Sequence, residues 1–271
     1  MVSLKRTLLS EIASTIEVLN HINHDVSKSN LHSPLRYSAV LLSIGKTTQI
    51  CHQNIPLKKV HCEGRIIYAS AIPRKLEKIW QQPADEIASL FLSVLQAKEM
   101  QSVWASVRKN NDGWIEFDIS QHGIEQWRQQ LTQQIFPLRE NIPSWPMEAA
   151  QLWQLQSGYE LCCRWQACHH QVGISQMESE HLSSAVFRMS FLPLRRLIHC
   201  LLSICDGWDE ASLPYLLQQT HQLIAALECC ASETRPSASE AGDVSRWLAS
   251  TQIVLKQLLE GRLGNEIAEQ F

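Results

Sequence analysis

Apolar and polar residues alternate in two short runs in the first half of the chain, and this pattern predicts a β-hairpin. Residues 103–107 and 115–119 each place an apolar or small residue at every second position, as half-buried strands do. The segment NNDG at 110–113 separates the two runs and contains the Asp-Gly pair typical of a tight hairpin turn. We interpret Gly64 and Gly113 as turn glycines, because glycine tolerates positive φ.

The residues before this hairpin predict one helix and two strands. Residues 4–22 carry apolar residues in steps of three and four, which predicts an amphipathic helix. Residues 25–34 (DVSKSNLHSP) are polar and are predicted to be a loop. Residues 35–45 and 64–72 are short apolar runs, and we interpret both as strands.

Two more helices are expected on either side of the hairpin. The run QPADEIASLFLSVLQ at 82–96 opens with Pro83, which fits the first turn of a helix. Asp85 and Glu86 follow it, and acidic residues are favoured at the positive end of the helix dipole. After the hairpin, the sequence HGIEQWRQQL predicts a helix that ends near Gln134.

The second half of the chain has helical patterns alone. The predicted helices cover about 147–171, 179–205, 209–231 and 243–261. In the first of these, one side carries Trp153, Tyr159, Cys163 and Ala167. The apolar stripe of the last helix consists of Trp247, Val254, Leu255, Leu258 and Leu259.

Two segments of the second half are predicted to connect structured parts. FPLRENIPSWP contains three prolines in eleven residues, which indicates a domain boundary at 137–146. Residues 231–242 are small and polar and are predicted to be a linker, with Asp243 as the cap of the last helix. We therefore expect an α+β protein. An α/β domain with an antiparallel sheet occupies 1–136, and an all-α helical bundle occupies 147–271.

The composition is that of an ordinary globular protein, with 45% hydrophobic and 19% charged residues. No apolar run approaches the roughly 18 residues that a membrane span requires. The N-terminal residues lack the apolar core of a signal peptide. We expect a cytoplasmic protein without a membrane partner.

The nine cysteines and the nearby histidines do not predict a metal site. No Cys-x-x-Cys spacing occurs in the chain. In Cys168-His169-His170, neighbouring side chains on a helix point about 100° apart, so they cannot converge on one ion. We interpret the cysteines as buried or half-buried thiols and expect neither a metal nor a cofactor.

The hairpin and the segment before it resemble a known family. GWIEF at 113–117, followed by Trp127 and Leu131, resembles the "GFINF.L" signature that ends the N-terminal additional domain of arginyl-tRNA synthetases. Residues 64–91 resemble the "GDYATNVALKLAK…NPREIA" segment of the same domain. The matching positions are Gly64, Tyr68, Ala69, Ser70, Leu76, Pro83 and Glu86-Ile87-Ala88.

The second half resembles the helical anticodon-binding domain of those enzymes, known as the DALR domain. Residues 245–264 (SRWLASTQIVLKQLLEGRLG) are similar to its closing helix. LWQLQSGYELCC resembles the entry helix "vQYAHAR", with Gln156 retained, whereas Ser157, Tyr159 and Leu161 replace its Tyr, His and Arg. The chain also resembles short cyanobacterial proteins that contain a DALR anticodon-binding domain.

The resemblance implies a protein without ligase activity. In the synthetases a catalytic Rossmann core lies between these two domains, whereas about 15 residues separate Leu131 from Met147 here. That is too short for the phosphate-binding strand–loop–helix of an adenylate-forming site. His21-Ile22-Asn23-His24 is similar to the class I "HIGH" motif. We interpret it as coincidence, because it ends a predicted helix and precedes a loop.

The same resemblance implies tRNA as a partner. The chain has a net charge of −3, so a polyanion must be bound by a local patch. Residues 58–78 hold six basic residues against two glutamates, a local charge of +4. The candidate RNA-binding residues are Lys58, Lys59, Arg65, Arg74, Lys75, Lys78, Trp114, Arg195 and Arg196.

Each candidate also has a purely structural interpretation. The basic residues of 58–78 could form a solvated face with surface ion pairs. The strand pattern places Trp104 and Trp114 on the sides opposite the valine and isoleucine residues, where a tryptophan can stack a base or pack under a helix. The alternative function is a protein–protein interaction module that no longer binds RNA, because aromatic residues and arginines are also favoured at interface centres.

Overall fold

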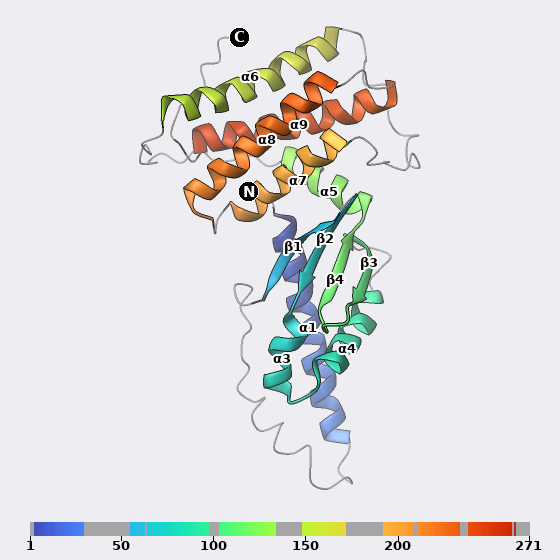
Figure 1. Cartoon of the computed structure of the whole chain (residues 1–271). Helices are drawn as coiled ribbons and strands as arrows, with labels where there is room; N and C mark the ends of the chain where they lie inside the picture. The colour runs from blue at the N-terminus through green and yellow to red at the C-terminus, as the bar shows by residue number, and fades with distance from the viewer. Residues whose placement is uncertain are drawn as a thin grey trace. The chain divides into compact units, whose positions relative to one another are not determined.

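The computed structural model describes residues 3–29, 55–62, 64–97, 103–133, 148–171, 192–208, 211–233, 238–261 and 263. The chain divides into two compact units (Figure 1). The α/β unit is Leu4–Glu125, and the helical unit is Met1–Ser3 with Gln126–Phe271. An N-terminal antiparallel sheet is followed by helices, which confirms the predicted α+β class. The predicted 137–146 linker lies outside the described residues.

The α/β unit contains a sheet of four antiparallel strands in the order β1-β2-β4-β3. Its elements in chain order are α1 (Leu4–Ser29), β1 (Leu57–Cys62), β2 (Arg65–Ser70), α3 (Ile72–Trp80), α4 (Ala84–Gln96), β3 (Trp104–Lys109), β4 (Ile115–Ile119) and the start of α5 (Gln121–Gln133). Strand β2 and helix α4 confirm the predictions for 64–72 and 82–96. The strand predicted at 35–45 lies outside the described residues. Strand β1 was not predicted.

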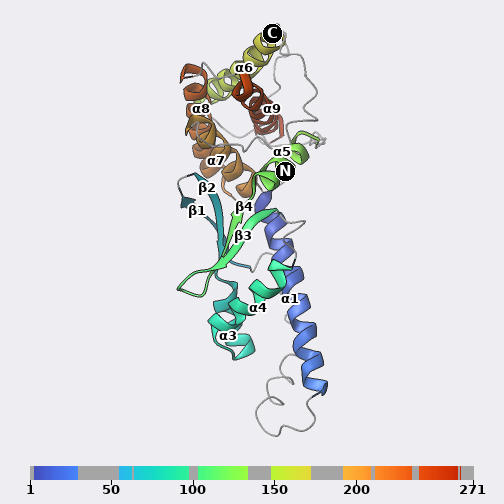
Figure 2. The same ribbon diagram turned by 90° about the vertical axis from the view of Figure 1, so that its right-hand side faces the viewer.

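Helices α1 and α4 lie on one side of the sheet (Figure 2). The side of the sheet that faces them is apolar. Tyr68, Phe117 and Val107 form one row across three strands and are all buried. Burying apolar surface in this way is the main favourable contribution to folding. The core of the unit therefore lies between the sheet and these two helices.

Helix α1 is longer than its apolar pattern predicts. Its apolar side is buried through Leu19 as expected, but the helix continues to Ser29, so the loop predicted from residue 25 is wrong at its start. No glycine or proline occurs between His24 and Ser29, so no residue in this stretch interrupts the helix. The HIGH-like residues 21–24 lie inside this helix.

The β3–β4 hairpin confirms the predicted turn. Asn110 accepts a backbone hydrogen bond from Gly113 at 3.1 Å. The side-chain oxygen of Asn110 also accepts from the N–H groups of Asp112 and Trp114, at 3.0 Å each. Gly113 has φ 71°, a conformation that glycine adopts without the cost of a Cβ. The asparagine and the glycine thus fix the turn together.

A register shift in β3 overturns the expected position of Trp104. Trp104 pairs with Ile119 and Ser106 pairs with Asp118, so Ala105 is an extra residue, a β-bulge. The bulge turns Trp104 to the side of the sheet that faces the core, where it is 3% exposed. Its ring meets Phe117 edge-on, with 5.5 Å between the centroids. Trp104 is therefore a core residue and is not available to stack a base.

The helical unit is formed by the end of α5 and by α6 (Ala149–Gln171), α7 (Leu192–Gly207), α8 (Leu213–Glu233) and α9 (Ala238–Gly261). Helix α6 packs along α9, and α7 packs along α8. All described elements after Ile119 are helices, as predicted. Residues 179–191 of the second predicted helix lie outside the described residues.

Two details of the helical prediction are wrong. Helix α9 begins at Ala238, so the 231–242 linker is partly helical and Asp243 lies within the helix instead of capping it. The apolar stripe predicted for α9 is buried as expected.

The buried face of α6 also differs from the prediction. Trp153 is 69% exposed, whereas Leu155 and Cys162 are buried. A Cβ at Gly158 would lie 2.9 Å from Ile224 of α8, so α6 approaches α8 through a glycine. An apolar pattern does not detect such a contact, because glycine carries no side chain.

Candidate functional site

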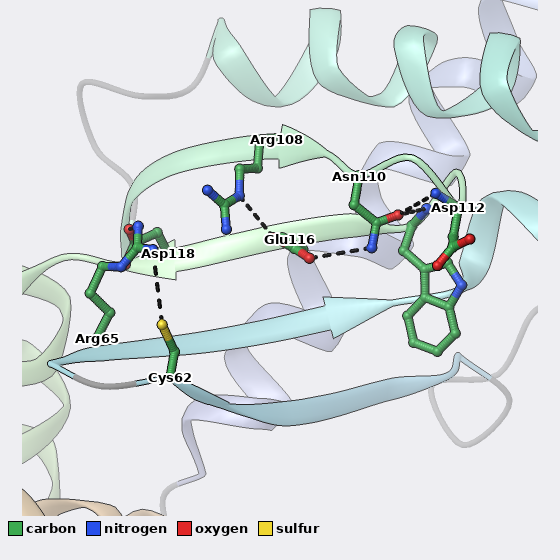
Figure 3. A network of polar contacts seen from close by, with 8 residues as sticks. Cys62, Arg65, Arg108, Asn110, Asp112, Glu116 and Asp118 are labelled. Atoms are coloured by element: carbon green, nitrogen blue, oxygen red, sulfur yellow. Dashed lines mark hydrogen bonds and ion pairs between the residues drawn. The ribbon is translucent and has the colours of Figure 1, made fainter.

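The face of the sheet opposite α1 and α4 carries charged side chains around Ile67 and Ala69, which are both buried (Figure 3). Among the described residues of the α/β unit, no helix lies over this face. Lys58, Ala69, Glu116 and Arg108 form one row across all four strands, because each pairs with the next in the register. We call this side of the sheet, with Lys58, Arg65, Ala69, Arg108, Glu116 and Asp118, the open face.

Arg65 and Asp118 form an ion pair at the end of the open face that holds the β1–β2 turn. Nη1 of Arg65 lies 3.1 Å from Oδ2 of Asp118, and Nη2 lies 3.9 Å from Sγ of Cys62 (Figure 3). These contacts raise the pKa of Arg65, first through Cys62 and then through Asp118. The guanidinium is therefore charged throughout the physiological range and is held by a carboxylate.

Arg108 and Glu116 form a second ion pair on the same face. Nε of Arg108 lies 2.8 Å from Oε2 of Glu116. The other carboxylate oxygen of Glu116 accepts a hydrogen bond from Nδ2 of Asn110 at 3.3 Å (Figure 3). Glu116 thus connects strand β3 to the hairpin turn. Both arginines of the open face are paired with carboxylates of β4.

Lys58 and Trp114 make a different kind of contact. Nζ of Lys58 lies 4.6 Å from the centroid of the Trp114 ring, which is the geometry of a cation–π interaction. Lys58 is exposed and Trp114 is half-buried. The lysine is on the edge strand β1, and the tryptophan directly precedes β4. The contact therefore places a cation and an aromatic ring side by side next to the hairpin turn.

The hairpin turn itself is held by two helices. Nε of Arg74 in α3 donates to the backbone oxygen of Asp112 at 2.7 Å. Nζ of Lys109 lies within ion-pair distance of Asp85 in α4 and 3.4 Å from Ser89 Oγ. The turn is thus tied to α3 and α4, which keeps the ring of Trp114 in a defined position.

The structure brings together only some of the predicted RNA-binding residues. Lys58 and Arg65 lie on the open face, whereas Lys59 points to the opposite side of β1 and is half-buried. Arg74, Lys75 and Lys78 are exposed on α3, and Arg74 reaches the hairpin turn. The +4 segment is therefore distributed over two sides of a strand and one helix, and Arg65 is paired with an acid.

Arg195 and Arg196 belong to the helical unit. Both lie in α7, where Arg196 is exposed and Arg195 is half-buried. The open face, by contrast, is defined by residues of the α/β unit.

Sequence reasoning missed Arg108, Glu116 and Asp118. Their signal was present in the hairpin pattern, because Glu116 and Asp118 alternate with the buried residues of β4. Charged residues at every second position of paired strands face one another on the same side of a sheet. The prediction identified the buried side of the hairpin and did not use the polar side.

The helical unit contains a polar cluster between α6 and α9. Nε2 of Gln252 lies 3.1 Å from Sγ of Cys163. Burial, followed by the nearby Cys163, raises the pKa of Tyr159. Burial also raises the pKa of the Cys162 thiol strongly. Tyr159 and Cys162 therefore stay protonated at neutral pH.

The described residues hold no group of three or more His, Cys, Asp or Glu side chains placed to bind a metal. Within the same residues, no helix has the length and apolarity needed to cross a membrane. No protein-family model, no curated protein and no solved structure matches the chain at a significant level.

Proposed function

We propose that this chain is a non-catalytic tRNA-binding protein related to arginyl-tRNA synthetase and built from the tRNA-contacting domains of that family. The order of elements supports the proposal, because a small antiparallel α/β unit is followed by helices in the described residues. The GWIEF segment that resembles the synthetase signature forms the end of the hairpin turn and the start of β4.

The contact of Lys58 with Trp114 carries the proposal. A protein that binds unpaired RNA combines aromatic rings, on which bases stack, with cations that meet the phosphates. Lys58 and Trp114 supply one of each beside the turn, and Arg74 lies at the same turn. Lys75 and Lys78 extend the basic surface along α3.

The test is an electrophoretic shift of bulk tRNA at about 50 mM and 200 mM salt. We expect binding at the lower concentration and a marked loss at the higher one, because phosphate contacts release counterions. About four such contacts give a slope of log K against log salt of roughly −3 to −4. Absence of a shift at 50 mM salt would refute tRNA binding.

A second candidate function is protein–protein interaction. Trp153 is 69% exposed on α6, and exposed tryptophans are favoured at the centres of protein interfaces. An affinity pull-down that yields a defined protein partner, lost on Trp153→Ala and free of RNA, would favour this function.

The proposal places the protein in the cytoplasm, with no metal and no cofactor. It also excludes ligase activity, since the chain offers too few residues for a class I core between its two halves. ATP–pyrophosphate exchange in the presence of arginine and tRNA is therefore expected to stay at background.

A further inference from the structure

We propose that Glu116 and Asp118 on the open face compete with phosphate groups of a ligand for binding to Arg108 and Arg65. Each carboxylate holds an arginine that a bound polyanion has to take over. The inference rests on the tRNA-binding function proposed above and adds the regulation of its affinity. Its first support is the pairing itself, because Arg65 and Arg108 each have a carboxylate of β4 as partner.

The exposure of the paired groups is unequal. The side chains of Arg65 and Arg108 are 48% and 54% exposed, whereas those of Asp118 and Glu116 are 20% and 17% exposed. The carboxylates therefore lie low against the sheet, and the guanidinium groups stand outside them. A ligand from solvent meets the arginines first.

The two carboxylates are regularly spaced. Glu116 and Asp118 are two residues apart on one strand, so their side chains lie on the same face about 6.6–6.8 Å apart along the strand. They present two anionic groups in a row, as consecutive phosphates of a nucleic acid do. A guanidinium group binds carboxylate and phosphate with the same fork of donors, so a phosphate can replace the carboxylate at each arginine.

Lys58 differs from both arginines in its partner. Its ammonium group contacts the ring of Trp114, and a ring does not cancel its charge. On the open face, the contact of Lys58 with the ring leaves the charge of the lysine in place. The charges of Arg65 and Arg108 are balanced by the carboxylates of Asp118 and Glu116. When a polyanion binds, its phosphates replace the carboxylates as partners of the two arginines. Breaking these ion pairs lowers the affinity for the polyanion, and the arginines release fewer counterions because the carboxylates had already neutralised them.

The test compares two variants of equal charge by the electrophoretic shift of bulk tRNA over a series of salt concentrations. In one, Glu116→Gln and Asp118→Asn are combined, which keeps the shapes of the side chains and removes both charges. In the control, Glu17→Gln and Glu228→Gln are combined; both glutamates are exposed, on α1 and α8. The first variant is expected to bind more tightly, with a slope of log K against log salt more negative by about 1.4, the value for two additional phosphate contacts on single-stranded RNA.

The control variant is expected to keep the wild-type slope. If both variants gain affinity equally, the effect is one of total charge and the inference is wrong. If the Glu116/Asp118 variant binds tRNA with the wild-type slope, the inference is wrong although tRNA binding stands.

A second measurement separates this inference from the proposed function. The Nε–Hε NMR signals of Arg65 and Arg108 are followed while tripolyphosphate is added to the wild-type protein and to the variant. The signals are expected to shift at a several-fold lower tripolyphosphate concentration in the variant. If tRNA is not bound by any form, the proposed function fails, and equal tripolyphosphate midpoints would then overturn the inference as well.

The single variants protect the test against misfolding. If the combined variant loses its native circular dichroism spectrum, Glu116→Gln and Asp118→Asn are measured separately. Each is expected to make the slope more negative by about 0.7, and an unchanged slope in both would overturn the inference.

Discussion

Gly123 lies directly against the carbonyl group of Val103. A Cβ at Gly123 would be 2.0 Å from the Val103 oxygen and 2.8 Å from its carbonyl carbon. The same oxygen accepts hydrogen bonds from Ser120 N–H and from its hydroxyl, each at 3.0 Å. The first turn of α5 and the start of β3 are thus packed backbone to backbone, and only glycine fits at this point.

We expect Gly123→Ala to lower the free energy of unfolding by about 1–3 kcal/mol, because the backbone has to move to admit the methyl group. Urea denaturation followed by circular dichroism measures the change. Gly261→Ala is the matched control, since a Cβ there meets only the flexible Gln257 side chain and alanine is favoured over glycine in helices. A stability of Gly123→Ala equal to wild type would contradict the close packing.

The tryptophan pair Trp127 and Trp247 is expected to stabilise the helical unit. Both are buried, and their ring centroids are 6.1 Å apart. Trp127→Ala should lower the free energy of unfolding by about 3–5 kcal/mol. Trp153→Ala should change it by less than about 0.5 kcal/mol, because Trp153 is 69% exposed. Thermal or urea unfolding of the two variants distinguishes them, and equal losses would be inconsistent with the structure.

The Lys58–Trp114 contact predicts two separate effects on tRNA binding. Lys58→Met removes the charge and should make the salt slope less negative by about 0.7–0.9. Trp114→Leu should weaken binding by about 1–3 kcal/mol with little change in the slope. Lys256→Met on α9 is the control, because Lys256 lies near Glu260 in the helical unit and is outside the candidate site. If Lys58→Met and Lys256→Met have the same slope, the role of Lys58 is refuted.

The Cys162 thiol predicts a pH dependence of stability. Burial raises its pKa far above the ordinary 9.0, so the thiol is protonated in the native state. Below about pH 8 it is also protonated in the unfolded chain and has no effect. Above pH 9 only the unfolded chain loses the proton, so stability falls by up to about 1.4 kcal/mol per pH unit.

The fall should be smaller in Cys162→Ala when both proteins are unfolded with urea between pH 8 and pH 10.5, because the contribution of Cys162 is removed while that of Tyr159, whose pKa is also raised, is present in both proteins. The substitution itself lowers stability by a pH-independent amount, because it leaves a small cavity. Parallel curves for the two proteins across this range would show that Cys162 ionises in the native state.

The elements of the fold were largely predictable from the sequence, because most of them bury one regular side. The hairpin, α4 and the stripe of α9 follow periodic apolar patterns that local sequence determines. Strand β1 was missed because its residues LKKVHC lie at the edge of the sheet, where half of the side chains are polar. The α6 face was missed in part because the helix meets Ile224 of α8 at Gly158, which has no side chain for an apolar pattern to detect.

The candidate site was less predictable than the fold. Sequence position groups Lys58 with Lys59, but strand geometry separates them onto opposite sides. Trp114 and Lys58 are far apart in the chain. They meet because β2 pairs with β1 on one side and with β4 on the other, which brings the two ends of these strands close together. The ion pairs of Arg65 and Arg108 depend on the register of three strands, which local patterns do not define.

Because Ala105 is an extra residue in β3, the length of the strand could change by one residue without changing which side chains lie in the core. In a regular strand the residue directly before Ser106 would pair with Ile119, and here that residue would be an alanine. With the bulge, the indole of Trp104 fills the place. In a homologous chain that lacks this one residue, the tryptophan would still pair with the equivalent of Ile119 and lie in the core. Strand β3 of that chain would be straighter, because it would have no bulge. A gap at this column of an alignment would therefore mark a change of strand curvature and leave the interior as it is.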